Sequence, residues 1–122
     1  MHTVVQPDLS IVVPAFNERR RLERTLREAF DEMYRRGERW EIIVVDDGST
    51  DVTSAIVVRL STMFPDLRLI RLPVNRGKGY AVRAGVLDAR GKLVLVADAH
   101  GATPIAELER LDQTRAPAEH PV

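Results

Sequence analysis

The sequence predicts an α/β fold, a mostly parallel sheet with flanking helices. Short apolar runs rich in β-branched residues recur along the chain, and a segment with helical spacing of apolar residues follows each of them. Runs that are apolar throughout indicate strands buried on both faces, as in parallel sheets, and the regular alternation fits right-handed crossovers. The 122 residues suit one domain with a core of its own.

The first strand is predicted over residues 9–14, LSIVVP, after a loose leader of residues 1–8. Pro14 should end this strand, because proline has no N–H to donate to a neighbouring strand. A long helix then follows with leucine and aromatic side chains at helical spacing, and it should run to about Arg36. Gly37 is expected to end the helix.

The second strand is centred on four consecutive apolar residues, 42–45, which indicate burial on both faces. Asp46 and Asp47 follow directly, and two adjacent carboxylates would be costly inside a core. We therefore expect both acids to face a ligand. Gly48 permits a tight turn, and residues 49–51 offer caps for the next helix.

The next segments continue the alternation. A helix over residues 52–64 should end at Pro65, and residues 67–72 alternate apolar and basic side chains, as a half-exposed strand does. A third helix is expected to extend to about residue 90, where Gly91 would end it.

A fourth strand is predicted over residues 92–98, KLVLVAD, and again ends in an acid, Asp98. A Thr-Pro pair indicates the start of a last helix over about residues 104–113. Residues 114–122 are expected to form a disordered tail.

Loops that follow parallel strands converge on one edge of the sheet, the edge where open α/β sheets bind ligands. Asn17 and Glu18 follow the first strand, where they could contact a ligand. They could equally form the cap and first turn of the long helix. The loops expected at this edge are residues 14–18, 46–49, 75–79 and 98–101.

Two further patterns at this edge are consistent with anion or metal binding. Gly77 and Gly79 would let backbone amides approach an anion while Lys78 adds a positive charge, although a plain turn explains them equally well. The pattern is neither a P-loop nor a dinucleotide-binding fingerprint. Asp98 is placed to bind a divalent cation, and His100 is either a second ligand or a surface histidine.

The overall composition excludes several classes of function. Eighteen basic and eighteen acidic residues cancel, so no bulk charge indicates a nucleic-acid partner. The absence of cysteine excludes disulfides, thiolate metal sites and a cysteine nucleophile. We expect a cytoplasmic protein, because the sequence shows no signal peptide and no apolar run near the ~18 residues that cross a bilayer.

Four motifs in this order and spacing resemble glycosyltransferase family 2. They are SIVVPAFNE (residues 10–18), EIIVVDDGSTD (41–51), NRGKGYAVRAG (75–85) and VADAHGATP (96–104). The third and fourth most resemble the branch that contains dolichyl-phosphate β-glucosyltransferases, with polyprenyl-phosphate mannosyltransferases close by. The resemblance implies a GT-A fold, a UDP-glucose or GDP-mannose donor, and inverting transfer to a polyprenyl or dolichyl phosphate with Mg²⁺ or Mn²⁺.

The same resemblance implies roles for individual residues. The nucleoside pocket would be lined by four residues of the first motif, Pro14, Ala15, Asn17 and Glu18. Asp47 would face the uracil or guanine edge, with Asp46 beside it. Base and phosphates would lie near Lys78 and the backbone of Gly77 and Gly79. Asp98 and His100 match the family's DxD motif, which binds ribose, metal and diphosphate.

In this family the acceptor-binding half and the catalytic base follow the DxD motif. We therefore expect the domain at residues 9–113 to be an N-terminal, donor-binding part that is apparently truncated, and we nominate no catalytic base. The alternative is a non-catalytic nucleotide-sugar-binding module. A nucleotidyltransferase is disfavoured, because no basic glycine-rich loop follows the first strand. A sheet that ends this early would leave apolar surface exposed, so self-association is also expected.

Overall fold

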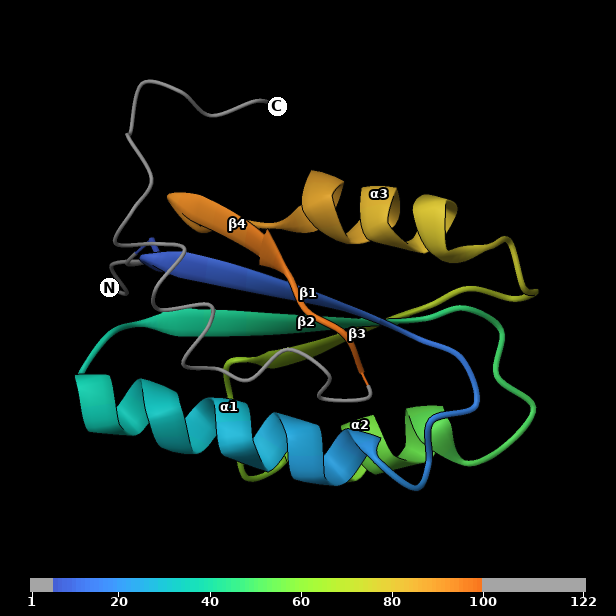
Figure 1. Ribbon diagram of the computed structural model, residues 1–122, viewed down its shortest axis with the longest axis horizontal. Coiled ribbons are helices and arrows are strands. Elements are labelled where there is room, and N and C mark those ends of the chain that lie inside the picture. Colours follow the sequence, from blue (N-terminus) through green and yellow to red (C-terminus); the bar gives the residue numbers. More distant parts are fainter. Residues whose placement is uncertain (1–5, 100–122) are drawn as a thin grey trace, which may run out of the picture.

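The computed structural model describes residues 6–99, which form one parallel sheet between two layers of helices (Figure 1). The strand order is β3-β2-β1-β4, and every neighbouring pair is parallel. Helices α1 and α2 cover one face of the sheet and α3 covers the other. The elements are β1 (Leu9–Ala15), α1 (Leu22–Arg36), β2 (Trp40–Asp46), α2 (Thr53–Ser61), β3 (Leu67–Arg71), α3 (Lys78–Asp88) and β4 (Leu93–Val96).

This arrangement confirms the predicted α/β class and the predicted order of elements. The last helix (residues 104–113), the tail (114–122) and the first five residues of the leader lie outside the described residues. The end of the leader is not loose, because the Pro7 carbonyl accepts from the Lys92 N–H at 3.0 Å and the Asp8 carbonyl from Leu93 at 3.2 Å. None of the helices described between residues 6 and 99 is long and apolar enough to span a membrane.

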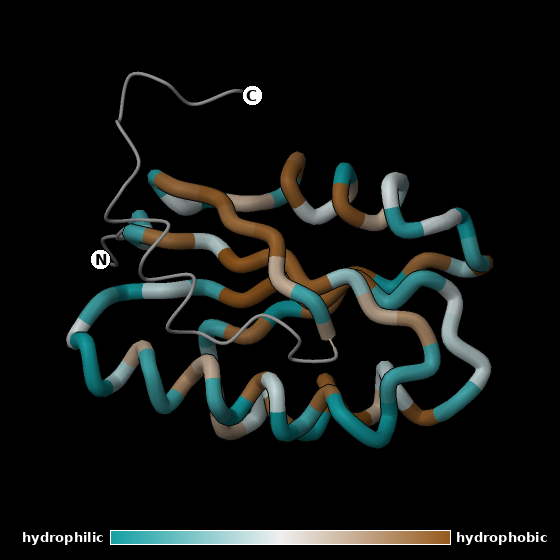
Figure 2. Tube along the Cα trace, in the orientation of Figure 1, coloured by the Kyte–Doolittle hydropathy of each residue, from teal (hydrophilic) through white to brown (hydrophobic). Residues whose placement is uncertain are grey.

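Burial of the central strand organises the core. All seven residues of β2 are buried, as its uninterrupted apolar run predicted. On the side of α1 and α2, the Phe30 ring stacks on Phe64 with ring centroids 4.4 Å apart. On the side of α3, Ala81 packs against Val12 and Val45 in a smaller cluster. Figure 2 shows hydrophobic residues concentrated in the strands, whereas hydrophilic and hydrophobic residues alternate along the helices.

Several element ends differ from the predictions: α2 ends at Ser61 rather than at residue 64, and β4 ends at Val96, two residues before Asp98. Two further differences have a clear physical reason. Strand β1 continues one residue past Pro14. The pairing of β1 with β4 ends at Val12, whose carbonyl points toward β4 and accepts the Ala97 N–H. Pro14, two residues further along, faces the same side, where β4 no longer pairs. Its missing N–H costs no ladder hydrogen bond. Helix α3 ends at Asp88 rather than near residue 90, because the Arg90 and Gly91 N–H groups donate to the Glu41 and Ser10 side chains of the sheet.

Candidate functional site

A cavity of about 350 Å³ lies at the carboxyl edge of the sheet, where the loops after β1, β2 and β3 meet at the right of Figure 1. It brings together six of the residues predicted for the site, Pro14, Ala15, Glu18, Asp47, Gly77 and Lys78. Three more lining residues were not predicted, Phe16, Asn75 and Ala81. The predicted convergence of loops on this edge is therefore observed, and a concave space lies between them.

Asp47 joins the loops that surround this cavity. Its side chain is 4% exposed, and its own N–H donates to the Ala15 carbonyl at 2.8 Å. One carboxylate oxygen accepts the Arg76 N–H at 2.7 Å and the other accepts the Gly77 N–H at 2.9 Å. Hydrogen bonds to a charged acceptor are stronger than neutral ones, so this carboxylate orders the third loop while its negative charge lines the cavity.

Asp46 has a different role from the one predicted. It is 1% exposed and is not among the residues that line the cavity. One oxygen accepts the Ser49 N–H at 2.9 Å and the other accepts the Ser54 hydroxyl. Both oxygens of Asp46 are thus bonded within the protein, whereas Asp47, the first residue past β2, lines the cavity. The expectation for Asp46 is corrected: its carboxylate shapes the turn before α2.

Neither Asn17 nor Glu18 is the N-cap of α1. The helix begins at Leu22, with Arg21 as its N-cap. The Glu18 carbonyl accepts the Leu22 N–H at 2.9 Å and the Arg21 N–H at 3.1 Å. Glu18 lines the cavity, whereas Asn17 does not. Asn17 instead lines a neighbouring hollow of about 220 Å³ beside Asp51.

The glycine–lysine–glycine pattern forms the start of α3. Gly77 has a φ of 99° and precedes the helix, whose first residue is Lys78. Lys78 and Gly77 line the cavity, while Gly79 lies inside the helix and does not. A helix N-terminus carries partial positive charge and unpaired N–H groups, and a lysine at its first position adds a full charge. This wall of the cavity suits an anion.

The predicted metal ligands are only partly within the described residues. Asp98 is half-buried and lies just past β4, while His100 is outside the described residues. The segment is anchored by the Ala97 N–H, which donates to the Val12 carbonyl at 2.9 Å, and by the Thr25 hydroxyl, which donates to the Ala99 carbonyl at 3.0 Å. Residues 6–99 contain no group of three metal-ligating side chains. A single carboxylate still suits Mg²⁺, which commonly takes one or two carboxylates together with substrate phosphates.

Phe16 is the main lining residue that the sequence interpretation missed. It is 44% exposed, although the preceding residue, Ala15, is buried. An aromatic residue in a loop at the ligand edge, outside any helical or strand periodicity, was the signal that could have identified it. Nearby, the Arg76 guanidinium lies over the Tyr80 ring, 5.5 Å from its centroid.

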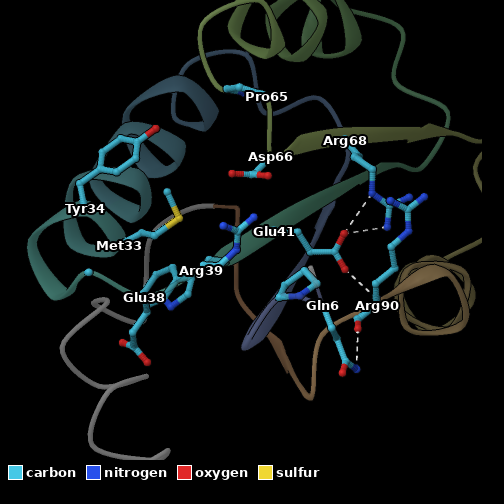
Figure 3. Close-up of a pocket in the computed structure, with 13 residues that line it drawn as sticks. Gln6, Met33, Tyr34, Glu38, Arg39, Glu41, Pro65, Asp66, Arg68 and Arg90 are labelled. Atoms are coloured by element: carbon cyan, nitrogen blue, oxygen red, sulfur yellow. Dashed lines mark hydrogen bonds and ion pairs between the residues drawn. The ribbon is translucent and has the colours of Figure 1, made fainter. Parts of the chain in front are cut away.

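A larger cavity of about 710 Å³ lies at the opposite, amino edge of the sheet (Figure 3). Glu41 is its main buried charge, and both carboxylate oxygens are bonded within the protein. Arg68 donates to one of them at 2.9 and 3.1 Å, and the Arg90 N–H and the Ser10 hydroxyl donate to the other. Arg68 also pairs with Asp88. This network ties β1, β2 and β3 to the end of α3, which is a structural role.

The Glu41 network makes stability depend on pH. Burial by itself raises the pKa of Glu41, but hydrogen bonds from Ser10, the Arg90 N–H and Arg68 outweigh it and hold the pKa below its ordinary value. A lowered folded pKa contributes stability above the unfolded pKa, and that stability is lost as pH falls through the folded value.

Glu41→Gln should therefore reduce the free energy of unfolding by about 2 kcal/mol at neutral pH, because Arg68 keeps only part of its pairing. The difference from wild type should shrink as pH falls below 4.5. Urea unfolding from pH 7 to pH 3 measures both effects. Glu28→Gln is the control, since Glu28 forms an exposed pair with Arg24 at 3.8 Å and should show neither effect. A Glu41 variant with a pH profile parallel to wild type would contradict this assignment.

Comparison with known proteins adds to this geometry. The chain matches the family described as glycosyl transferase family 2 over residues 10–113. It is 44% identical over 110 residues to a dolichyl-phosphate beta-glucosyltransferase of Trichomonas vaginalis and 41% identical over 112 residues to the dolichyl-phosphate beta-glucosyltransferase of Homo sapiens. These alignments cover 86% of this chain and 34% and 35% of the relatives. The chain thus spans about a third of the length of the curated relatives it matches.

Two solved structures share the fold. One is a mannosyltransferase from Pyrobaculum calidifontis in complex with GDP-Man and Mn²⁺, with a TM-score of 0.69 and 33% identity over 79% of this chain and 28% of the other. The second is residues 1–349 of TarS from S. aureus in complex with UDP-GlcNAc, with a TM-score of 0.69 and 26% identity over 87% of this chain and 31% of the other. The mostly parallel sheet described above is therefore the sheet of GT-A glycosyltransferases.

Proposed function

The chain belongs to glycosyl transferase family 2, and on this premise we propose that it is the donor-binding part of a glycosyltransferase that binds UDP-glucose or GDP-mannose. The observation that carries the proposal is the cavity at the carboxyl edge, with Asp47 on one wall and Lys78 at the start of α3 on another. An acidic acceptor and a cationic helix start are complementary to the base N–H groups and to the diphosphate of such a donor.

Each wall of the cavity would contribute a different part of the binding. The Asp47 carboxylate has lone pairs left after accepting two backbone N–H groups, and these can accept from a uracil or guanine edge. The exposed ring of Phe16 offers an apolar surface to the nucleoside. Lys78 and the unpaired N–H groups at the start of α3 would hold the phosphates.

We propose Mg²⁺ or Mn²⁺ as the metal, with Asp98 as a ligand and His100 as a second one. A divalent ion at the leaving nucleoside diphosphate offsets the negative charge that develops there. Relatives named dolichyl-phosphate beta-glucosyltransferase support glucose as the sugar and a dolichyl or polyprenyl phosphate as the acceptor. We propose inverting transfer of the sugar to such an acceptor.

The alternative is a non-catalytic module that binds nucleotide-sugar without transferring the sugar. The observation that favours it is that residues 6–99 contain no group of three metal-ligating side chains. An assay of sugar transfer to a polyprenyl phosphate separates the two functions. Turnover supports the transferase, whereas donor binding without turnover supports the module.

Isothermal titration with UDP-glucose and GDP-mannose, with and without Mn²⁺, tests the proposed function. We expect binding that Mn²⁺ strengthens, and an Asp98→Ala variant that stays folded but loses the Mn²⁺-dependent part of the affinity. His100→Asp should strengthen the response to Mg²⁺, because hard cations prefer oxygen ligands. Asp31→Ala, an exposed acid on α1, is the control. Absence of heat with either donor would contradict donor binding, and an unchanged Mn²⁺ response in Asp98→Ala would contradict the metal assignment.

We also propose that the outer edge of β4 pairs with a second copy of the chain. Within residues 6–99 no strand lies on that edge, and β4 carries no charge, with Val96 43% exposed. The other edge strand, β3, carries Arg68 and Arg71, and charges of this kind discourage edge pairing. Light scattering over a dilution series should show a mass that rises with concentration, and a constant monomer mass would contradict the proposal.

A further inference from the structure

Asn17 has an unusual backbone conformation next to the candidate site. Among the described residues it is the only non-glycine residue with a positive φ, 52°. Asparagine tolerates this left-handed conformation better than most residues, because its short polar side chain bonds locally. Asn17 is exposed, so packing in the core does not impose this conformation.

The Asn17 side chain bonds to the loop that follows β2. Its Oδ1 accepts the Thr50 N–H at 2.9 Å and the Asp51 N–H at 3.3 Å. In the opposite direction, the Asn17 N–H donates to the Ser49 Oγ at 2.8 Å. One residue therefore both donates to and accepts from a loop more than thirty residues away in the sequence.

Neighbouring residues extend the same connection. The Glu18 N–H donates to the Thr53 Oγ1 at 3.0 Å, and the Thr53 hydroxyl donates to Asp51. The Asp51 carboxylate also accepts the Thr53 N–H at 2.8 Å. We call this set the Asn17 clamp, and it consists of Asn17, Glu18, Ser49, Thr50, Asp51 and Thr53.

The position of the clamp connects it to the cavity. Phe16 and Glu18, the residues on either side of Asn17, both line the cavity, although Asn17 itself does not. The second loop also carries Asp47, which holds the third loop through Arg76 and Gly77. The loop after β2 is therefore bonded to both of the other loops that form the walls.

We propose that Asn17 is a positioning residue, which sets the distance between the Phe16–Glu18 wall and the Asp47 wall of the donor cavity. This inference rests on the proposed function, because it assigns the residue a part in nucleotide affinity. Its side-chain oxygen orders the Thr50 and Asp51 amides, and its left-handed backbone directs Phe16 and Glu18 toward the cavity. Without the clamp, the pairing of β1 with β2 and the Asp47 N–H bond to the Ala15 carbonyl still join the two walls, but the Phe16–Glu18 segment is no longer held to the second loop and the cavity is less preformed.

Three variants separate the contributions of Asn17. Asn17→Gly keeps the positive φ and removes the acceptor, whereas Asn17→Asp keeps both. Gln6→Ala is the matched control, because it removes one exposed side-chain hydrogen bond, to the Arg90 carbonyl, at the opposite edge of the sheet. The measurements are affinity for UDP and GDP, thermal unfolding, and hydrogen exchange of the Thr50 and Asp51 amides.

We expect Asn17→Gly to weaken binding of both nucleotides by about tenfold, the order expected for loss of one or two hydrogen bonds that hold a site together, with little change in thermal stability. Exchange of the Thr50 and Asp51 amides should accelerate in this variant. Asn17→Asp should retain the affinity and the protection, and Gln6→Ala should match wild type in both.

Wild-type affinity in Asn17→Gly would overturn the inference while leaving the proposed function intact. An Asn17→Asp variant as weak as Asn17→Gly would also overturn it, because the acceptor and the backbone conformation are both kept. If the wild-type chain binds neither UDP nor GDP, the proposed function fails, and hydrogen exchange alone tests whether Asn17 positions the second loop. In that case unchanged exchange at Thr50 and Asp51 in Asn17→Gly would show that the clamp does not order the second loop.

Discussion

Replacing Asp47 with alanine is expected to weaken nucleotide binding by roughly a hundredfold or more. Two backbone N–H groups, of Arg76 and Gly77, would lose a charged acceptor, and hydrogen bonds to charged groups contribute about 1.5–3 kcal/mol each. The loop that carries Lys78 to the cavity would no longer be held, and the acidic group proposed to face the base would be gone. Both losses act on the same affinity.

Titration calorimetry with UDP and GDP measures this effect, and thermal unfolding shows whether the variant stays folded. Asp66→Ala is the control, because Asp66 is an exposed acid at the amino edge of the sheet and lines the other cavity. We expect this control to bind nucleotide as wild type does. A folded Asp47→Ala variant with unchanged affinity would contradict the role assigned to this carboxylate.

Gly48→Ala is expected to lower the free energy of unfolding by about 3 kcal/mol or more. Gly48 has a φ of 74°, and a Cβ there would lie 2.4 Å from the Asn75 nitrogen and 2.5 Å from the Val74 carbonyl carbon. These are backbone atoms, so relief requires that the third loop moves away from the second. Nucleotide affinity should fall as well, since Asn75 and Gly77 line the cavity.

Gly37→Ala separates the two causes. Gly37 has a similar φ of 69°, but a Cβ there meets nothing within 4 Å. This control should cost only the backbone term, about 1 kcal/mol. Urea unfolding of both variants gives the difference, which measures how closely the second and third loops pack. Equal losses of stability would mean that the close approach at Gly48 contributes nothing.

Much of the fold was predictable from local patterns. The uninterrupted apolar run of β2 predicted burial on both faces, and Gly37 ends α1 in a left-handed conformation, as predicted. The half-exposed character of β3 followed from the two arginines among its apolar residues. The end of α3 was not predictable, because Glu41 and Ser10 on distant strands bind the Arg90 and Gly91 N–H groups.

The candidate site was predictable to the level of loops but not of individual side chains. Parallel strands dictate that their following loops converge, so Asp47 and Lys78 could be placed at one edge from the sequence. The separation of Asp46 from Asp47 could not be predicted, because it depends on hydrogen bonds that Ser49 and Ser54 donate to Asp46. The partner of Asn17 could not be found in this way, because hydrogen bonds between two irregular loops leave no periodic signal in the sequence.

We expect a nucleotide to bind at the carboxyl edge of the sheet and not in the larger cavity at the amino edge. Titrating UDP and GDP into the ¹⁵N-labelled chain and following amide chemical shifts tests it most directly. We expect the largest shifts at the residues that line the smaller cavity, Ala15, Glu18, Asp47, Gly77 and Lys78. Largest shifts at Arg39, Glu41 and Arg90, or no shifts with either nucleotide, would contradict it.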